Sequence, residues 1–111
     1  MSEIIVTGGR NYNDTDKVFD VLNFIKPTKI IQGGAQGADW IAKNWALKNN
    51  VLCVTVHADW DTHGKAAGPI RNLKMLTDFP LASVVSFPGG RGTANCVATA
   101  LSMSRIVLDV K

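Results

Sequence analysis

Five short apolar runs, each separated from the next by a segment with helical spacing, constrain the fold of this chain more than any other feature. The runs are residues 4–6, 29–32, 51–56, 81–87 and 105–110. Runs this short and this apolar are typical of strands buried on both faces of a parallel sheet. Strands that alternate with helices over short connections predict an α/β fold with helices on both faces. Because five strands are too few to close a barrel, we expect an open, doubly wound, Rossmann-like sheet with strand order 3-2-1-4-5.

The first two segments between strands carry clear helical signals. Asp14 is a residue type that favours the N-cap position, and apolar residues follow it at helical spacing. The second helix begins near Gln36 and ends at Asn49-Asn50, with Trp45 on its apolar face. Trp40 lies on the opposite side of this helix, where an exposed indole would indicate a dimer surface.

The second half of the chain predicts two more helices and one long connection. Residues 57–68 are expected to be irregular, and a third helix begins at Gly68-Pro69 with proline in its first turn. A fourth helix is expected over residues 93–104. Two sets of apolar residues are expected to face the sheet: Ile70, Leu73 and Leu76 in the third helix, and Ala94, Val97, Ala98 and Leu101 in the fourth.

Three glycine-rich sequences directly follow three of the expected strands. They are Gly8-Gly9-Arg10, Gly33-Gly34-Ala35-Gln36-Gly37-Ala38-Asp39 and Pro88-Gly89-Gly90-Arg91-Gly92-Thr93-Ala94-Asn95. Glycine permits positive φ and close backbone approach, so several N–H groups can face one anion, and the N-terminus of a following helix adds partial positive charge. In the predicted strand order, the first and third of these loops flank the reversal of the sheet, where ligands of such folds bind. We therefore expect one shared anionic ligand beyond the carboxyl ends of the strands.

Basic and polar side chains near these loops complete the expected site. Arg10, Arg71 and Arg91 lie in or just after loops at strand ends, and Lys65 joins them. A guanidinium is a planar cation that suits phosphate. The expected ligand-binding residues are Gly8, Gly9, Arg10, Gly33, Gly34, Gly37, Asp39, Trp60, Lys65, Arg71, Asn72, Pro88, Gly89, Gly90, Arg91, Gly92 and Thr93.

Several of these side chains have a second interpretation that the sequence leaves open. Arg91 contacts phosphate or is a solvated loop residue, and Thr93 binds the ligand, caps its helix, or does both. Asp39 recognises ribose, or is favoured in the first helical turn by the dipole alone. Arg10 faces the crevice, or pairs with an acidic residue at the next helix start. Trp60 stacks on a base, or plugs the edge of the sheet.

The connection before the third helix contains two glycines, Gly64 and Gly68, that would make it mobile. Lys65 lies between them, and Arg71 and Asn72 follow closely in the chain. We hypothesise that residues 59–68 fold over the ligand as a lid.

The composition is that of an ordinary folded domain, with 46% hydrophobic and 19% charged residues among 111. This length suits one domain, residues 1–111. No apolar run approaches the length of a membrane span, so we expect a cytoplasmic protein without membrane contact. Cys53 and Cys96 fall in elements far apart in the predicted sheet, so we expect two reduced cysteines. We expect no metal site, because no His or second Cys stands at ligand spacing.

Four ordered motifs make the chain resemble the SLOG superfamily of small Rossmann-like domains, most closely its YspA-like branch. The motifs are Gly8-Gly9-Arg10; Gly33 to Asp39; Ala58-Asp59-Trp60 with His63 to Asn72; and Pro88 to Ala94. The resemblance implies a nucleotide-binding role, with nucleotides or derived molecules such as ADP-ribose or NAD-related compounds as ligands. It also implies a homodimer.

The third glycine-rich loop departs from the LOG-type phosphoribohydrolases of the same superfamily. Their PGGxGTxxE motif ends in a catalytic glutamate, whereas Asn95 and Cys96 stand where acidic residues would be expected here. Cleavage of an N-glycosidic bond passes through a cationic sugar, which a carboxylate stabilises far better than an amide or a neutral thiol. The sequence therefore weighs against LOG-type hydrolysis.

Three functions are consistent with these observations. The first is a binding module that senses, carries or sequesters a small anionic nucleotide-like ligand and requires no cofactor. The alternative is a hydrolase acting on the N-glycosidic or phosphate bond of a nucleotide or nucleoside, for which Asp59, Asp61 and His63 are the available acids or bases. The third is a single-stranded nucleic-acid binder of DprA type. It is disfavoured because the basic residues cluster at strand ends instead of forming a stripe.

Overall fold

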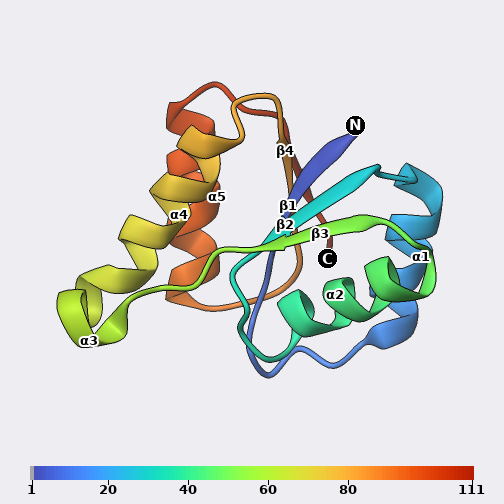
Figure 1. The fold of residues 1–111 in the computed structure, drawn as a ribbon, viewed down its shortest axis with the longest axis horizontal. Helices are drawn as coiled ribbons and strands as arrows, with labels where there is room; N and C mark the ends of the chain where they lie inside the picture. Colours follow the sequence, from blue (N-terminus) through green and yellow to red (C-terminus); the bar gives the residue numbers. More distant parts are fainter. Residues whose placement is uncertain (1) are drawn as a thin grey trace.

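A computed structural model describes residues 2–111 of the chain and shows a five-stranded, all-parallel sheet (Figure 1). The strands are β1 (Glu3–Thr7), β2 (Lys29–Gln32), β3 (Leu52–Thr55), β4 (Ser83–Ser86) and β5 (Val107–Asp109). The helices are α1 (Thr15–Ile25), α2 (Ala38–Lys48), α3 (Trp60–His63), α4 (Ala67–Asp78) and α5 (Arg91–Ser102), and a 3-10 turn, η1 (Gly64–Ala66), joins α3 to α4. The order is β3-β2-β1-β4-β5, so the predicted α/β class and strand order are confirmed.

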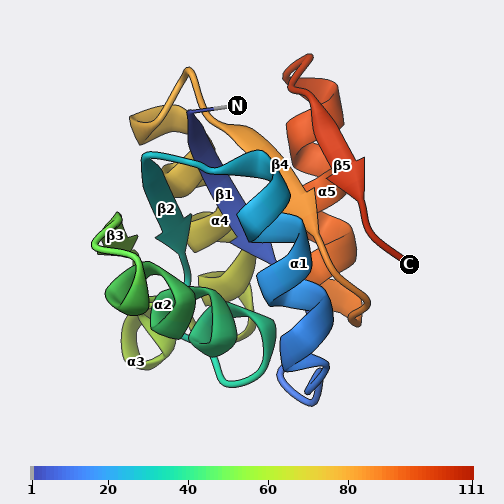
Figure 2. The same cartoon turned by 90° about the vertical axis from the view of Figure 1, so that its right-hand side faces the viewer.

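Helices cover both faces of the sheet, because alternate strand residues bury their side chains on opposite sides. Ile4 and Val6 of β1 pack in the core under α1 and α2, whereas Ile5 packs in the core under α4 and α5. Figures 1 and 2 show these two helix pairs on either side of the strands. The predicted N-cap of α1 is confirmed, since the Asp14 carboxylate accepts from the Lys17 amide at 3.0 Å.

The inward face of α4 differs from the expected one. Leu76 is fully buried as predicted, but Ile70 and Leu73 are 44% and 50% exposed. Met75 and Asn72 face inward instead, both about 2% exposed. The apolar pattern was misleading because the first turns of α4 lie beside the carboxyl ends of the strands. There the inward side chain of Asn72 has polar groups of α5 to bind, so it is not penalised for burial.

The inward face of α5 differs in the same way. Thr93, Cys96 and Ala100 are buried against the sheet. The predicted stripe is wrong, since Leu101 is 59% exposed and Ala94 is exposed as well. Both helices therefore turn a mixed polar and apolar face toward the sheet and leave aliphatic side chains outside.

The connection between β3 and α4 is more regular than expected. Asp59 caps the short helix α3 by accepting from the Thr62 amide at 3.2 Å. Gly64, with a φ of 55°, ends that helix, and η1 leads directly into α4 at Ala67. The prediction of an irregular segment over residues 57–68 is thus wrong for residues 60–68, because a local cap was available for α3 and α4 begins at Ala67.

The structure also tests the predictions for the two tryptophans of α2 and for the two cysteines. Trp45 is buried at 3% exposure, as predicted for a core residue, whereas Trp40 is 60% exposed. Cys53 is half-buried, Cys96 is buried, and both carry free thiols. Within residues 2–111, no helix has the length and apolar character that a membrane span requires.

Candidate functional site

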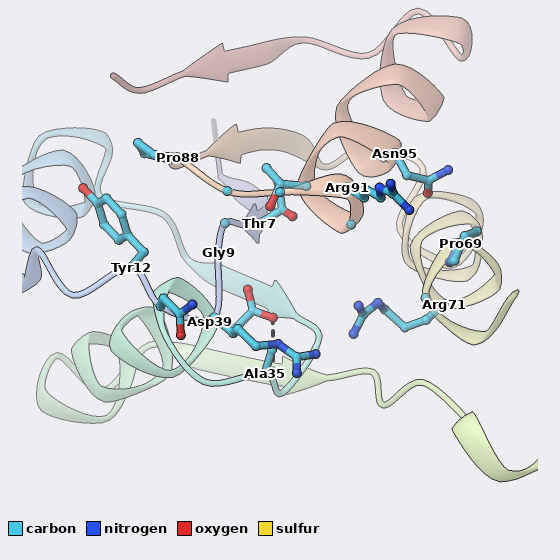
Figure 3. A pocket seen from close by; sticks show the side chains of 18 of the residues that line it. Thr7, Gly9, Tyr12, Ala35, Asp39, Pro69, Arg71, Pro88, Arg91 and Asn95 are labelled. Atoms are coloured by element: carbon cyan, nitrogen blue, oxygen red, sulfur yellow. Dashed lines mark hydrogen bonds between the residues drawn. The ribbon is translucent and has the colours of Figure 1, made fainter. Parts of the chain in front are cut away.

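A pocket of about 890 Å³ opens at the carboxyl ends of β1 and β4, where the sheet reverses direction. Residues 7–12 and 88–93 form two of its walls, and the start of α4 forms a third. Figure 3 shows side chains from these segments around the pocket, with Thr7 and Asp39 on one side and Arg71, Arg91 and Asn95 on the other. The position is the one that the strand order predicts for a ligand.

The loop between β4 and α5 presents a free helix N-terminus to this pocket. Gly90 occupies the N-cap of α5 and has no side chain to bond the first-turn amides, which the helix itself also leaves unpaired. Arg91 and Thr93 belong to that first turn and line the pocket. Unpaired N–H groups, the helix dipole and a guanidinium together make a site that favours an anion.

The three glycine-rich loops meet at the backbone of Gly9. Its amide donates to the Pro88 carbonyl at 2.9 Å, and its carbonyl accepts from the Ala38 amide at 3.3 Å. A Cβ on Gly37, whose φ is 80°, would overlap the Gly9 carbonyl and the Arg10 backbone. Glycine in these loops therefore permits loop-to-loop packing as well as access to a ligand.

Amides of the loop between β2 and α2 donate hydrogen bonds to nearby side chains of the protein. The Oδ2 atom of Asp39 accepts from the amides of Gly33 and Ala35 at 3.1 and 3.4 Å. The Gly34 amide donates to the side chain of Gln32 at 2.5 Å. An internal carboxylate thus already occupies the place that an anion would take on this loop, so these amides are not available to a ligand.

Asp39 is the acidic residue of the pocket. Its side chain projects into the pocket beside Ala35 in Figure 3, although the residue is only 6% exposed. Burial raises the pKa of Asp39 to about 6, opposed by the hydrogen bond from the Ala35 amide, the charge of Arg71 and the hydrogen bond from the Gly33 amide. Its second oxygen, Oδ1, is buried and has no hydrogen-bond partner within residues 2–111.

Arg71 is held at the pocket wall by contacts on both sides. Its Nη1 atom donates to the Gly33 carbonyl at 3.0 Å, and its Nε atom donates to Asn72 Oδ1 at 2.9 Å. Asn72 in turn donates to the Gly92 carbonyl at 3.1 Å and to Asn95 Oδ1 at 3.0 Å. Asn72 therefore fixes α4 to α5 and orients Arg71, while its own side chain is 2% exposed and does not line the pocket.

The structure gathers most of the sequence-predicted residues in this one pocket. Those that line it are Gly8, Gly9, Arg10, Asp39, Trp60, Lys65, Arg71, Pro88, Gly89, Gly90, Arg91, Gly92 and Thr93. Gly33 and Gly34 instead line a neighbouring hollow of about 380 Å³ with His57, and Gly37 lines a third hollow with Trp40. The two larger glycine-rich loops thus do not contribute equally to the pocket.

Several residues that line the pocket were not predicted from the sequence. They are Thr7, Asn11, Tyr12, Ala35, Gly68, Pro69 and Asn95. Thr7 ends β1 and Asn11-Tyr12 follows the first glycine-rich loop, so proximity to a strand end was an available signal. Asn95 lies one helical turn after Arg91, on a face that only the packing of α5 against α4 reveals.

The predicted acid and base candidates lie elsewhere. Asp59 caps α3, Asp61 and His63 lie within it, and all three are exposed. None of them lines the pocket or either neighbouring hollow. The hydrogen bonds to Thr62 lower the pKa of Asp59, so this carboxylate is committed to capping the helix. In the part of the chain that the structure describes, no group of three or more His, Cys, Asp or Glu residues is placed to hold a metal ion.

The sheet order and the pocket at its reversal define a small Rossmann-like α/β protein. Comparison with known families is more specific: the chain belongs to the YAcAr family, the YspA, cpYpsA-related SLOG family, whose model matches residues 2–63. The resemblance inferred from the motifs is therefore confirmed. The chain is also 37% identical over 115 aligned positions to the Gene 61 protein of Mycobacterium phage D29, covering 90% of this chain and 89% of that protein.

Proposed function

We propose that this protein binds a nucleotide or nucleotide-derived ligand, acting as a sensor, carrier or sequestering module. The observation that carries the proposal is the uncapped N-terminus of α5, which opens into the pocket at the reversal of the sheet. Arg10, Lys65, Arg71 and Arg91 line the same pocket, so cationic side chains surround those amides. Backbone donors and guanidinium groups together suit a phosphate.

The size and lining of the pocket support a ligand larger than phosphate alone. A volume of about 890 Å³ falls in the range of small-molecule sites. Trp60 is 53% exposed at the pocket wall, where its indole offers a face on which a base can stack. The neighbouring hollow shares Arg10, Ala35, Trp60 and Arg71 with the pocket, which leaves room for the second half of an ADP-ribose-like or NAD-like molecule.

Binding is a better proposal than hydrolysis because the pocket has little catalytic equipment. Asp59 and Asp61 lie outside the pocket on exposed positions of the α3 segment. Burial raises the pKa of Cys96 to about 11, so its thiol is not a nucleophile at neutral pH. Asp39 is the one acid on the pocket wall within residues 2–111, and its Oδ2 atom is engaged by two backbone amides.

The test is a thermal-shift screen at fixed salt against ribonucleoside mono-, di- and triphosphates, ADP-ribose and NAD, followed by calorimetry. At least one compound should stabilise the protein, since a ligand of the folded state raises its apparent stability. Arg91→Ala should weaken that compound about 10- to 100-fold through loss of a charge-assisted contact. Lys43→Ala, on the exposed side of α2 away from the pocket, is the matched control and should bind normally.

Two results would contradict the proposal. Absence of any thermal shift across the panel would show that the protein binds none of these ligands. Conversion of the bound compound during long incubation, detected by chromatography, would show that the protein is a hydrolase and not a binding module.

A further inference from the structure

Within residues 2–111, Asp39 Oδ1 is the one buried side-chain nitrogen or oxygen atom that has no hydrogen-bond partner. The Oδ2 atom of the same carboxylate holds the Gly33 and Ala35 amides at 3.1 and 3.4 Å, which already orders the loop between β2 and α2. Oδ1 is buried and has no partner within the described chain, although the residue lines the pocket. A buried carboxylate oxygen without a donor costs folding free energy. A donor supplied by the ligand would remove that cost.

The surroundings of Oδ1 decide which kind of donor suits it. A phosphate is excluded there, because a second anion beside a buried carboxylate would be repelled. A cationic group is also disfavoured, because Arg71 already provides positive charge to Asp39, and Arg10 lines the same pocket. A neutral donor remains.

A hydroxyl fits this position better than the amino group of a base. The backbone amides open to an anion lie at the N-terminus of α5, and the flat aromatic surface of Trp60 lies in α3. Asp39 lies in the first turn of α2, on a part of the pocket wall separate from both. In a nucleotide, the sugar connects the phosphate to the base, so a ligand that used both of those features would bring its hydroxyls to the remaining wall.

On the basis of the proposed function, we propose that Asp39 Oδ1 accepts a hydrogen bond from a sugar hydroxyl of the ligand. The site then selects ribonucleotides and their derivatives over analogues that lack the ribose 2′- and 3′-hydroxyls. Asp39 acts as a specificity-determining residue, and the α5 N-terminus supplies affinity for the phosphate. A hydrogen bond to a buried carboxylate is strong enough to make the affinities for a ribonucleotide and its dideoxy analogue differ about 10- to 100-fold.

The experiment compares the four ribonucleoside 5′-triphosphates with their 2′,3′-dideoxy counterparts by calorimetry. Wild-type protein should bind at least one ribonucleotide about 10- to 100-fold more tightly than its dideoxy partner. In Asp39→Asn the two should differ by less than about threefold, because the charged acceptor is gone. The substituted amide keeps one oxygen for the Gly33 and Ala35 amides, so the loop retains its internal contacts.

Wild-type protein provides a second measurement that does not require a folded variant. Between pH 8 and pH 5 the Asp39 carboxyl, with its pKa of about 6, becomes protonated, and the ratio of the two affinities should fall. Arg71 and Cys96 are the other ionisable groups that act on Asp39, and the Cys96 thiol, with its pKa of about 11, stays protonated across this range. Titration of the phosphates affects both members of each pair equally and does not alter the ratio.

The outcomes separate this inference from the proposed function. Equal affinity of wild-type protein for both members of a pair would show that Oδ1 accepts no hydrogen bond from the sugar and would overturn the inference, while phosphate binding would stand. A ratio that persists in Asp39→Asn and at pH 5 would also overturn it. Failure of all eight compounds to bind would overturn it too, and the wider nucleotide panel would then decide whether the proposed function falls as well.

Discussion

Asp39 is a single residue that lowers the stability of the folded protein at neutral pH and also lines the pocket. Its carboxylate is 6% exposed, with one oxygen bonded to two amides and the other unpaired. Burial raises its pKa from an ordinary 3.8 to about 6. Between those two pH values the folded chain binds more protons than the unfolded chain, so stability falls as the pH rises through this window. At neutral pH the cost is about 3 kcal/mol.

Asp39→Asn should therefore be more stable than wild type at pH 7, because it removes a buried charge and keeps an acceptor for the loop amides. The gain should be at most about 3 kcal/mol and should shrink as the pH falls through 6 toward 4, where wild-type Asp39 is neutral in the folded state. Urea unfolding at a series of pH values measures it. Asp61→Asn changes an exposed carboxylate of α3 and is the control. A difference from wild type that is independent of pH would contradict this account of Asp39.

At the scale of elements, the strand ends are held together by glycine. Gly9 bonds to the Pro88 carbonyl and to the Ala38 amide, so the loops after β1, β2 and β4 pack against one another through their backbones. Gly37 lies at the N-cap of α2 with φ of 80°, a conformation that costs other L-residues free energy. The pocket therefore depends on close packing of three loops, in which the loop after β1 contacts each of the other two.

Gly37→Ala should destabilise the protein by about 2 to 4 kcal/mol, because the added Cβ combines an unfavourable φ with overlap against the backbone of Gly9 and Arg10. Gly92→Ala is the matched comparison, since nothing lies within 4 Å of a Cβ there and the position is helical. It should be neutral or stabilising by up to about 1 kcal/mol. Equal destabilisation by both substitutions in urea titrations would show that loop packing is not the reason for glycine at position 37.

The elements also show which predictions from sequence could succeed. Strand positions and order followed from apolar runs and short connections, because burial on both faces leaves a clear signal. The inward faces of α4 and α5 did not follow, because Asn72 and Thr93 face the interior while Leu73 and Leu101 face outward. Apolarity alone cannot identify a helix face that packs over the polar end of a sheet.

For the whole molecule, the composition of the pocket was more predictable than its bonding. Glycine-rich strand ends and nearby arginines indicated most of the lining residues, because the strand order places the ends of β1 and β4 together. The hydrogen bonds from the Gly33 and Ala35 amides to the Asp39 carboxylate had no signal in the sequence. It depends on the φ and ψ of the loop and on the depth of burial, which arise only after the loops have packed.

The molecule has one peripheral part that reaches the pocket, the α3–η1 segment. It has no buried residues of its own and lies beyond the start of α4 in Figure 1, yet Trp60 and Lys65 line the pocket. Few buried contacts mean that opening this segment costs little free energy, so ligand contacts should restrain it. Saturating ligand should slow amide hydrogen exchange in residues 60–66, as expected for a lid, while α1, on the far face of the sheet from α4, should exchange as before. Unchanged exchange in residues 60–66 at saturation would show that the ligand is held by the loops at the ends of β1 and β4 alone, with the segment serving only to join β3 to α4.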